Sequence, residues 1–264
     1  MNYGTYLSTG GVLASMRRMD VIANNLANAT TIGFKPDLVT ALERPAERVE
    51  GLSPLSDPLA PPQEMLERLG GGLKFAPDRI DFRQGELERS GNASDLALRG
   101  GGFFVVGPAK GKMDPKGPID LTRAGNFVVD SDGTFRASGS NRPIMGEGGE
   151  PVRIDPRRPY IVDKVGRVVQ GDTEVARFRV VKPRQPAGVE KVGGNLFRTS
   201  GGVDRVADDE TSVEQHMTEL SVADPVTAMV DLMRESRMLE ANVRMIQYQD
   251  NLTGQAISGI TRVG

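Results

Sequence analysis

Apolar residues recur at helical spacing near the N-terminus. On a helical wheel that advances about 100° per residue, one stripe within residues 3–28 consists of Val12, Met16, Met19, Ile22, Ala23 and Leu26. Such a stripe predicts one amphipathic helix over residues 3–28. Gly33 follows soon afterwards and suits the chain reversal that ends a helix.

The C-terminal part has a longer helical pattern. A seven-residue repeat is formed by Leu232, Leu239 and Ile246, flanked by Met229, Met233, Val243 and Met245. Ser221 and Asp224 are candidate N-caps, and Pro225 suits a first turn. We expect a helix from about Asp224 to Ile257, whose length and repeat favour a coiled coil or another interhelical contact.

The middle of the chain has a period of two instead. Ile80 and Phe82 alternate with charged residues, and Ala176, Phe178 and Val180 do the same further along. Short apolar runs separated by glycine turns continue to about residue 199. Since no helical pattern interleaves them, residues 79–200 predict a compact antiparallel β-domain.

One hairpin is predicted within this domain. Residues 127–129 and 134–136 flank a short turn, Asp130-Ser131-Asp132-Gly133, with glycine where a positive φ is needed. The expected fold class is therefore α+β, with an antiparallel β-rich central domain flanked by N- and C-terminal helices that pair in a coiled-coil-like core.

The expected organisation has five parts. An N-terminal axial helix spans residues 1–35, the β-rich domain spans 79–200, a connector spans 201–221 and a C-terminal axial helix spans 222–264. Prolines and glycines break any periodic element over 36–78, which we interpret as an extended loop or linker with a short helix possible over Pro62–Leu69.

Amides are unusually frequent at the end of the first helix, within DVIANNLANATTIGFK. Asn24, Asn25 and Asn28 are mediocre helix formers, so one interpretation is a fraying end near a cap. The other is a second contact face, because amides donate to and accept from neighbouring helices without burying charge.

Composition excludes several classes of protein. The chain has 264 residues and a formal net charge of −2, so no bulk attraction to nucleic acid or anionic membrane is expected. It has no cysteine, which excludes disulfides, thiolate metal sites and cysteine nucleophiles. No apolar run is long enough to span a bilayer, and we expect no cleavable secretory signal.

Residues suited to catalysis or cofactor binding are few. His216, the one histidine, lies in a polar stretch and is expected to be a solvated loop residue; Asp208-Asp209-Glu210 is interpreted as solvated surface. Gly100–Gly102 precede an apolar strand rather than a helix, so they indicate a bend or bulge and not a phosphate cradle. We expect no catalytic residues, no metal and no cofactor.

Several segments resemble a known family. DVIANNLANATTIGFK is similar to the N-terminal signature of bacterial flagellar axial proteins of the rod and hook group. Residues 85–106 resemble that group's G-x-L-x-x-T-G-N-x-x-D-[LV]-A-[IL]-x-G-x-G-F-F-x-V stretch. Residues 121–133 resemble its T-R-x-G-x-F element, 193–197 its G-x-N-L-[FY] element, and 219–226, with Arg237, Glu240 and Asn242, its C-terminal helix motif.

The resemblance implies a structural, non-enzymatic subunit of the basal-body rod, and the length and single β-domain are similar to the proximal or distal rod proteins rather than the larger hook protein. It implies a homo-oligomer that contacts other rod and hook proteins and the flagellar type III export apparatus, with no nucleic acid and no membrane insertion. The implied location is the periplasmic rod of the basal body, reached by export without a cleavable signal.

Exposed apolar stripes support the same view from the residues alone. Pairing the two helices with each other would hide only part of their stripes, and a large exposed stripe usually marks an interface. The expected subunit interface comprises Val12, Met16, Met19, Ile22, Asn24, Asn25, Leu26, Asn28, Met229, Leu232, Met233, Leu239, Asn242, Val243 and Ile246. The alternative is a secreted β-domain binding or adhesion module on a coiled-coil stalk.

Overall fold

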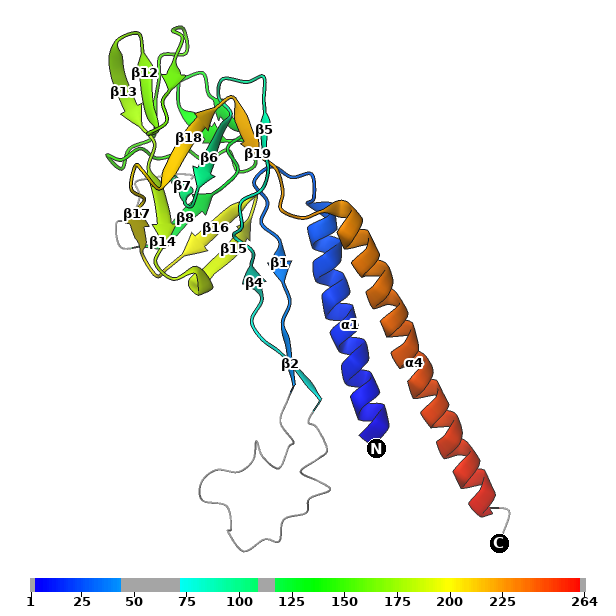
Figure 1. Cartoon of the computed structure of the whole chain (residues 1–264). Helices are drawn as coiled ribbons and strands as arrows, with labels where there is room; N and C mark the ends of the chain where they lie inside the picture. Colours follow the sequence, from blue (N-terminus) through cyan, green and yellow to red (C-terminus); the bar gives the residue numbers. More distant parts are fainter. Residues whose placement is uncertain (1–2, 44–71, 109–116, 262–264) are drawn as a thin grey trace, which may run out of the picture. The chain divides into compact units, whose positions relative to one another are not determined.

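The computed structural model describes residues 3–43, 72–108 and 117–261 (Figure 1). The chain divides into two compact units. The first, here called the helical unit, comprises residues 1–27, 37–79 and 224–264; the second, the β-body, comprises residues 28–36 and 80–223.

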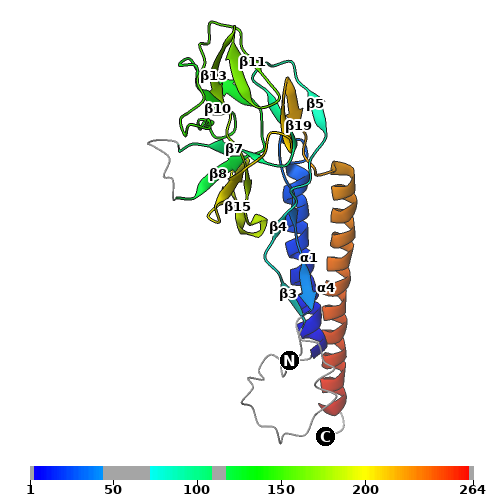
Figure 2. The same cartoon turned by 60° about the vertical axis from the view of Figure 1, so that its left-hand side comes forward.

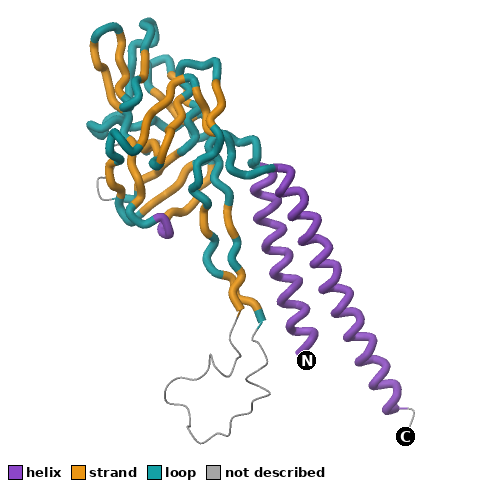
Figure 3. The backbone as a smooth tube through the Cα atoms, viewed as in Figure 1, coloured by secondary structure: helices purple, strands orange, loops and turns teal. Residues whose placement is uncertain are grey.

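Two long helices dominate the helical unit (Figure 3). The 25-residue α1 (Tyr3–Ala27) and the 37-residue α4 (Pro225–Thr261) lie along each other in opposite directions, as two views show (Figures 1 and 2). Both predicted helices are confirmed to within a few residues. Neither combines length and apolar character in the way needed to cross a membrane, over the residues described.

Asp224 begins α4 as predicted. Its carboxylate accepts hydrogen bonds from the backbone N–H groups of Val226 (3.2 Å) and Thr227 (3.1 Å), and Pro225 occupies the first helical position. The hydrogen bond from the Thr227 hydroxyl, followed by these two backbone bonds, holds the pKa of Asp224 below 3.8. Two of the N–H groups that a helix start leaves unpaired are thereby satisfied.

Short strands accompany α1 where a linker was expected. The strands are β1 (Asp37–Leu38), β2 (Ala41–Glu43), β3 (Leu73–Phe75) and β4 (Arg79–Ile80); β2 pairs with β3 and β1 with β4. The linker interpretation is therefore wrong for the described ends of 36–78, because strand pairing satisfies backbone groups that an isolated loop would leave to water. The short helix expected over 62–69 falls outside the described residues.

The β-body contains the other strands. They are β5 (Leu87–Arg89), β6 (Leu96–Gly100), β7 (Phe103–Val106), β8 (Ile119–Thr122), β9 (Phe127–Val129), β10 (Phe135–Ala137), β11 (Ile161–Val162), β12 (Arg167–Gln170), β13 (Thr173–Arg177), β14 (Val180–Pro183), β15 (Val189–Gly193), β16 (Leu196–Thr199), β17 (Val203–Arg205), β18 (Thr211–Gln215) and β19 (Met217–Glu219), with a 3₁₀ turn η1 (Pro186–Gly188). Its largest sheet has six strands in the order β15-β16-β8-β7-β14-β17. The paired registers are antiparallel, as predicted.

Apolar residues on both faces of this sheet form two clusters. The larger contains Phe104, Phe127, Phe135 and Phe178, whose rings meet mostly edge to face at centroid distances of 5.0–6.2 Å. The smaller contains Phe103 and Phe197, against which Phe82 packs. The β-body therefore has an apolar core of its own.

The predicted hairpin is present. β9 and β10 pair with Phe135 opposite Val129, and Gly133 has a φ of +79°. The alternation over residues 176–180 is broken, however: β13 ends at Arg177 and β14 begins at Val180, in a different sheet. One continuous strand was expected there, but Phe178 turns into the larger core cluster between the two sheets.

Two further expectations need correction. The strand predicted by the alternation of Ile80 and Phe82 with charged residues ends at Ile80, and Asp81 beyond it is buried and bonded to Arg83. Residues 201–221, expected as a connector, contain β17, β18 and β19, each paired within the β-body. β18 pairs with β6, and β19 pairs with β5. Each partner strand precedes its mate by more than 100 residues, so the local pattern did not reveal these pairs.

Candidate assembly surface

A regular seam of α4 faces α1. Its less exposed positions recur at alternating intervals of four and three and comprise Ala228, Leu232, Glu235, Leu239, Asn242, Ile246, Gln249 and Thr253. This is the spacing of a helix that packs along one neighbour. We call these residues, with the α1 residues opposite them, the inner seam.

Every second turn of the inner seam places a polar α4 residue against a specific α1 position. Gln249 meets Gly4 and accepts a hydrogen bond from the Thr5 hydroxyl (3.1 Å). A Cβ on Gly11 would lie 2.9 Å from the side chain of Asn242. Glu235 pairs with Arg18 at 3.4 Å. The three contacts advance seven residues on each helix, in opposite directions.

Small residues of α1 permit this approach. Gly4, Ser8, Gly11 and Ser15 follow one another at intervals of four and three, and both serines are buried. Short side chains leave room for the longer amides of α4. Small groups of α1 and polar groups of α4 therefore take part in the seam beside the apolar residues Leu232, Leu239 and Ile246.

The predicted interface residues separate into two groups. Those partly covered within this chain are Val12, Met19, Ile22, Asn25, Leu26, Asn28, Leu232, Leu239, Asn242, Val243 and Ile246. Those exposed are Met16, Asn24, Met229 and Met233. Several covered residues lie on the inner seam, so contact with a second copy is not needed to explain them.

Asn25 has an internal role that neither interpretation of the amides anticipated. Its side-chain N–H donates to the carbonyl of Asp37 (2.9 Å), and its carbonyl accepts from the Asp37 N–H (3.0 Å). The amide thus holds β1 against α1 in the way that a neighbouring strand would. Asn28 instead belongs to a turn, where its carbonyls accept from the N–H and hydroxyl of Thr31.

Large apolar side chains remain exposed on the outer sides of both helices. On α1 they include Leu13 (58% exposed) and Met16 (50%). On α4 they comprise Val226, Met229, Val230, Met233, Met238, Met245, Tyr248, Leu252 and Ile257, each about half exposed or more. A monomer rarely leaves so much contiguous apolar surface in water unless the surface binds something.

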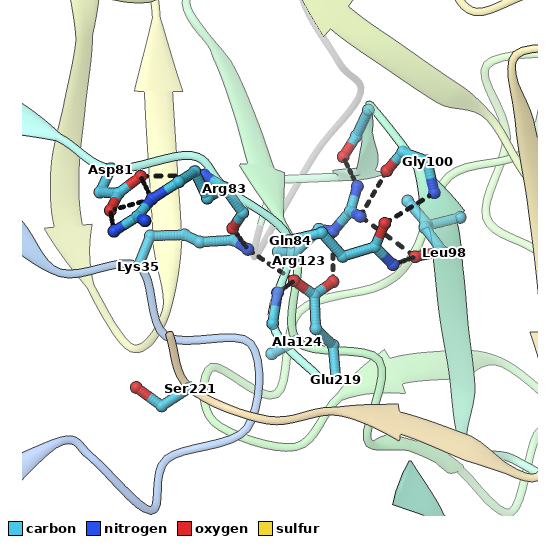
Figure 4. A network of polar contacts seen from close by, with 12 residues as sticks. Lys35, Asp81, Arg83, Gln84, Leu98, Gly100, Arg123, Ala124, Glu219 and Ser221 are labelled. Atoms are coloured by element: carbon cyan, nitrogen blue, oxygen red, sulfur yellow. Dashed lines mark hydrogen bonds and ion pairs between the residues drawn. The ribbon is translucent and has the colours of Figure 1, made fainter. Parts of the chain in front are cut away.

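The β-body holds a buried cluster of charges (Figure 4). The carboxylate of Glu219, which has no exposed side-chain surface, accepts hydrogen bonds from Lys35 Nζ (2.5 Å), Arg123 Nε (2.5 Å) and the N–H of Gly85 (2.9 Å). Lys35 also donates to the carbonyl of Arg83 (2.6 Å). Burial lowers the pKa of Lys35 below 10.5, and its hydrogen bond to Glu219 opposes only part of that effect.

Arg123 explains the glycine-rich stretch. Its guanidinium donates to the carbonyls of Leu98 (3.1 Å), Gly100 (2.6 Å) and Gly102. The glycines, with φ values of +112° and +121°, form the predicted bend. Their carbonyls face a cation, which is the opposite of an anion cradle.

The same cluster lies where the chain enters and leaves the β-body. The N–H of Gly33, which follows α1, donates to the carbonyl of Glu219, which precedes α4 (2.7 Å). Gly33 has a φ of +67°, and a Cβ there would lie 2.5 Å from the backbone N of Ala124. Sequence reasoning noted Gly33 but missed the roles of Lys35, Arg123 and Glu219, although each lies in or beside a motif that was singled out.

The remaining polar candidates are surface groups. His216 is exposed, with a φ of +61° between β18 and β19. Asp208 pairs with Arg177 (2.6 Å) at the surface. No group of three or more metal-ligating side chains occurs among the residues that the structure describes.

Comparison with known proteins shows full-length relatives. Residues 6–35 match the family "Flagella basal body rod protein", and residues 214–259 match "Flagellar basal body rod FlgEFG protein C-terminal". The chain is 30% identical to the flagellar basal-body rod protein FlgF of Caulobacter vibrioides, over 100% of this chain and 99% of that protein. The chain belongs to the flagellar basal-body rod protein family.

Other members are similar along nearly their whole length. The rod protein FlgG of Borreliella burgdorferi is 27% identical over 95% of this chain and 96% of its own. FlgF of Salmonella typhimurium is 27% identical over 97% of both chains. The chain is accordingly a structural subunit of the basal-body rod, and the adhesion-module alternative is not favoured.

Proposed function

We propose that this rod subunit assembles through the outer surfaces of α1 and α4, and that the assembled helices form the load-bearing core of a periplasmic shaft. In this arrangement α1 and α4 pair as a coiled coil within each copy, through the inner seam. The β-body adds thickness to the wall, and the shaft transmits torque from motor to hook.

The observation that carries the proposal is the apolar surface left over after α1 and α4 have met. The inner seam uses one side of each helix, yet Leu13 and Met16 on α1 and Met238 and Met245 on α4 are each 50% exposed or more. Burying such side chains between copies stabilises association by about 1.5–3 kcal/mol per fully buried residue. The β-body, with its own core, does not require this contact to fold.

The partners proposed are further copies of this chain, other rod and hook proteins, and the flagellar type III export apparatus that delivers the chain. A helix pair that leaves large apolar side chains exposed to water has only marginal stability by itself. A marginal pair keeps the free chain exportable and limits premature polymerisation.

Replacing Met245 with Asp tests the proposal. We expect the β-body to keep its fold while incorporation into purified hook–basal bodies and swimming are lost, because the charge would lie on the exposed surface of α4 that other copies cover. Leu13→Asp, on the exposed side of α1, is expected to behave in the same way. Incorporation is measured by mass spectrometry of the purified structures and folding of the β-body by protease resistance.

The matched control is Val128→Asp, an exposed position on β9 in the β-body. We expect this variant to incorporate and to support swimming. Normal incorporation of both helix variants at normal protein levels would overturn the proposal.

A further inference from the structure

A second regular seam runs along the exposed side of α1. Residues at alternating intervals of three and four, all exposed, comprise Tyr6, Thr9, Leu13, Met16, Asp20, Ala23 and Ala27. At about 100° per residue they lie on the side of α1 roughly opposite the inner seam. We call this row the outer seam of α1; Asp20 is its one charged member.

The middle of α4 has a row of the same spacing. Arg234, Met238, Ala241, Met245, Tyr248 and Leu252 follow one another at intervals of four and three, and all are exposed. This outer seam of α4 also has one charged member, Arg234, which is 72% exposed and makes an intrahelical contact of 3.4 Å with Asp231. The two outer seams are therefore alike in length, apolar character and spacing, and opposite in charge.

We infer that the outer seam of α1 in one copy packs antiparallel on the outer seam of α4 in a second copy, with Asp20 against Arg234. This inference rests on the proposed assembly through the helices. The register then places Met16 on Met238, Leu13 on Ala241 and Thr9 on Met245. Copies that point the same way satisfy the antiparallel contact, because α1 and α4 run in opposite directions within each copy.

Charge alone would permit other registers, but the apolar positions exclude them. Pairing Asp20 with Arg237 would place Leu13 on Arg244. Pairing Asp20 with Arg244 would place Leu13 on Asn251 and Thr9 on Gln255. Arg234 is the arginine of α4 that puts both Met16 and Leu13 on apolar residues, and a single ion pair in a seam is the kind of feature that specifies register.

Charge exchange tests the register. We expect Asp20→Lys and Arg234→Glu each to lower incorporation into hook–basal bodies on the order of tenfold, because each opposes like charges in the contact. The combined variant Asp20→Lys with Arg234→Glu should recover most of the loss. Arg237→Glu and Arg244→Glu are the matched controls, and neither should rescue Asp20→Lys.

Cysteine pairs give an independent test, because the natural chain contains no cysteine. Met16→Cys combined with Met238→Cys is expected to yield a ladder of disulfide-linked copies after oxidation of purified hook–basal bodies. Gly11→Cys combined with Asn242→Cys, on the inner seam, should give only an intrachain bond and no ladder.

Three results would separate the hypotheses. Rescue by Arg237→Glu or Arg244→Glu, or absence of the ladder, would overturn this register. Normal incorporation of Asp20→Lys and Arg234→Glu would overturn it as well, but the proposed function would stand if Met245→Asp still failed to assemble. Normal incorporation of Met245→Asp too would overturn both.

Discussion

The helical unit and the β-body differ in how far they bury their own side chains. The β-body encloses fully buried side chains such as Phe104, Leu121 and Phe135, and even its buried charges have partners on all sides. In the helical unit no described residue of α4 is fully buried, and the buried residues of α1 are Ser8, Ala14 and Ser15. The β-body is complete within a single copy, whereas the helical unit leaves large apolar side chains exposed, which we propose that further copies cover.

From this difference we propose that stability and assembly are assigned to separate parts of one chain. A core of large apolar groups keeps the β-body folded whether or not the rod forms. In the inner seam, leucine and isoleucine of α4 alternate with polar residues that meet glycines and serines of α1, and other large apolar side chains of both helices stay exposed for the proposed contacts between copies. The following predictions test that division.

The largest expected effect is on the buried charges of the β-body. Glu219→Gln should lower the free energy of unfolding by about 3–5 kcal/mol, because Lys35 and Arg123 would stay buried without a counter-charge. Urea denaturation followed by circular dichroism measures it. The matched control is Asp204→Asn, which breaks an exposed pair with Arg184 (2.7 Å) and should cost about 0–1 kcal/mol. Equal losses would show that burial of the cluster has no energetic importance.

The next largest effect is expected from leucine-to-alanine substitutions made in the β-body and in the helical unit. Leu121→Ala, at a fully buried site of the β-body, should cost about 2–5 kcal/mol of unfolding free energy. Leu239→Ala, at a half-buried site of the inner seam, should cost about 1 kcal/mol in the free chain, since less surface is buried there. Hydrogen exchange of the two regions distinguishes the losses. A larger loss at Leu239 would contradict the division.

Acid should weaken the β-body. Burial works to raise the pKa of Asp120, but hydrogen bonds from Arg198 (2.8 Å) and Arg142 (2.6 Å) outweigh it and hold that pKa below 3.8. The hydrogen bonds from Arg83 likewise lower the pKa of Asp81. Because the unfolded chain binds these protons first, the stabilisation is present above pH 3.8 and is lost as the pH falls below it.

The urea midpoint of the full chain should therefore fall as the pH is lowered below 3.8, and the fall should be shallower for Asp120→Asn. We expect a smaller loss than from either core substitution, because the Arg83 side chain is largely exposed to water and the Arg198 side chain is partly exposed. An Asp120→Asn variant with the same pH dependence as the natural chain would show that this carboxylate does not contribute.

The smallest effect compares two adjacent glycines of α1. The Cβ added by Gly10→Ala would have no neighbouring atom within 4 Å, so this variant should stabilise the helix by about 0.5–1 kcal/mol. Gly11→Ala gains the same propensity but must displace Asn242, so its net stabilisation should be smaller or negative. Thermal unfolding of the helices measures both. Equal stabilisation would mean that the inner seam is looser than the structure shows.

The elements themselves were largely predictable from local pattern. Both helices, the cap at Asp224, the β9–β10 hairpin and the bend at Gly100–Gly102 follow from residue type and spacing within a few turns of chain. The linker over 36–78, the connector over 201–221 and the single strand through Phe178 were wrong, since strand pairing joins segments far apart in sequence.

The candidate surface was predictable only in part. The seven-residue repeat through Leu239 indicated an interhelical contact, and the excess of apolar positions indicated that one partner would not cover them all. The polar repeat through Glu235, Asn242 and Gln249 was equally visible, but its meaning depended on the glycines opposite it. Asn25 could not be assigned, because its partner is the backbone of Asp37 rather than a side chain.

By itself, the sequence determined the periodic elements, the excess of apolar helix surface and the family motifs, because these depend on which residues are neighbours along the chain. Only the tertiary structure decided which side of each helix is used within the copy and that Lys35, Arg123 and Glu219 share one buried site. Such choices depend on distances between remote segments, and those distances arise only when the chain has folded.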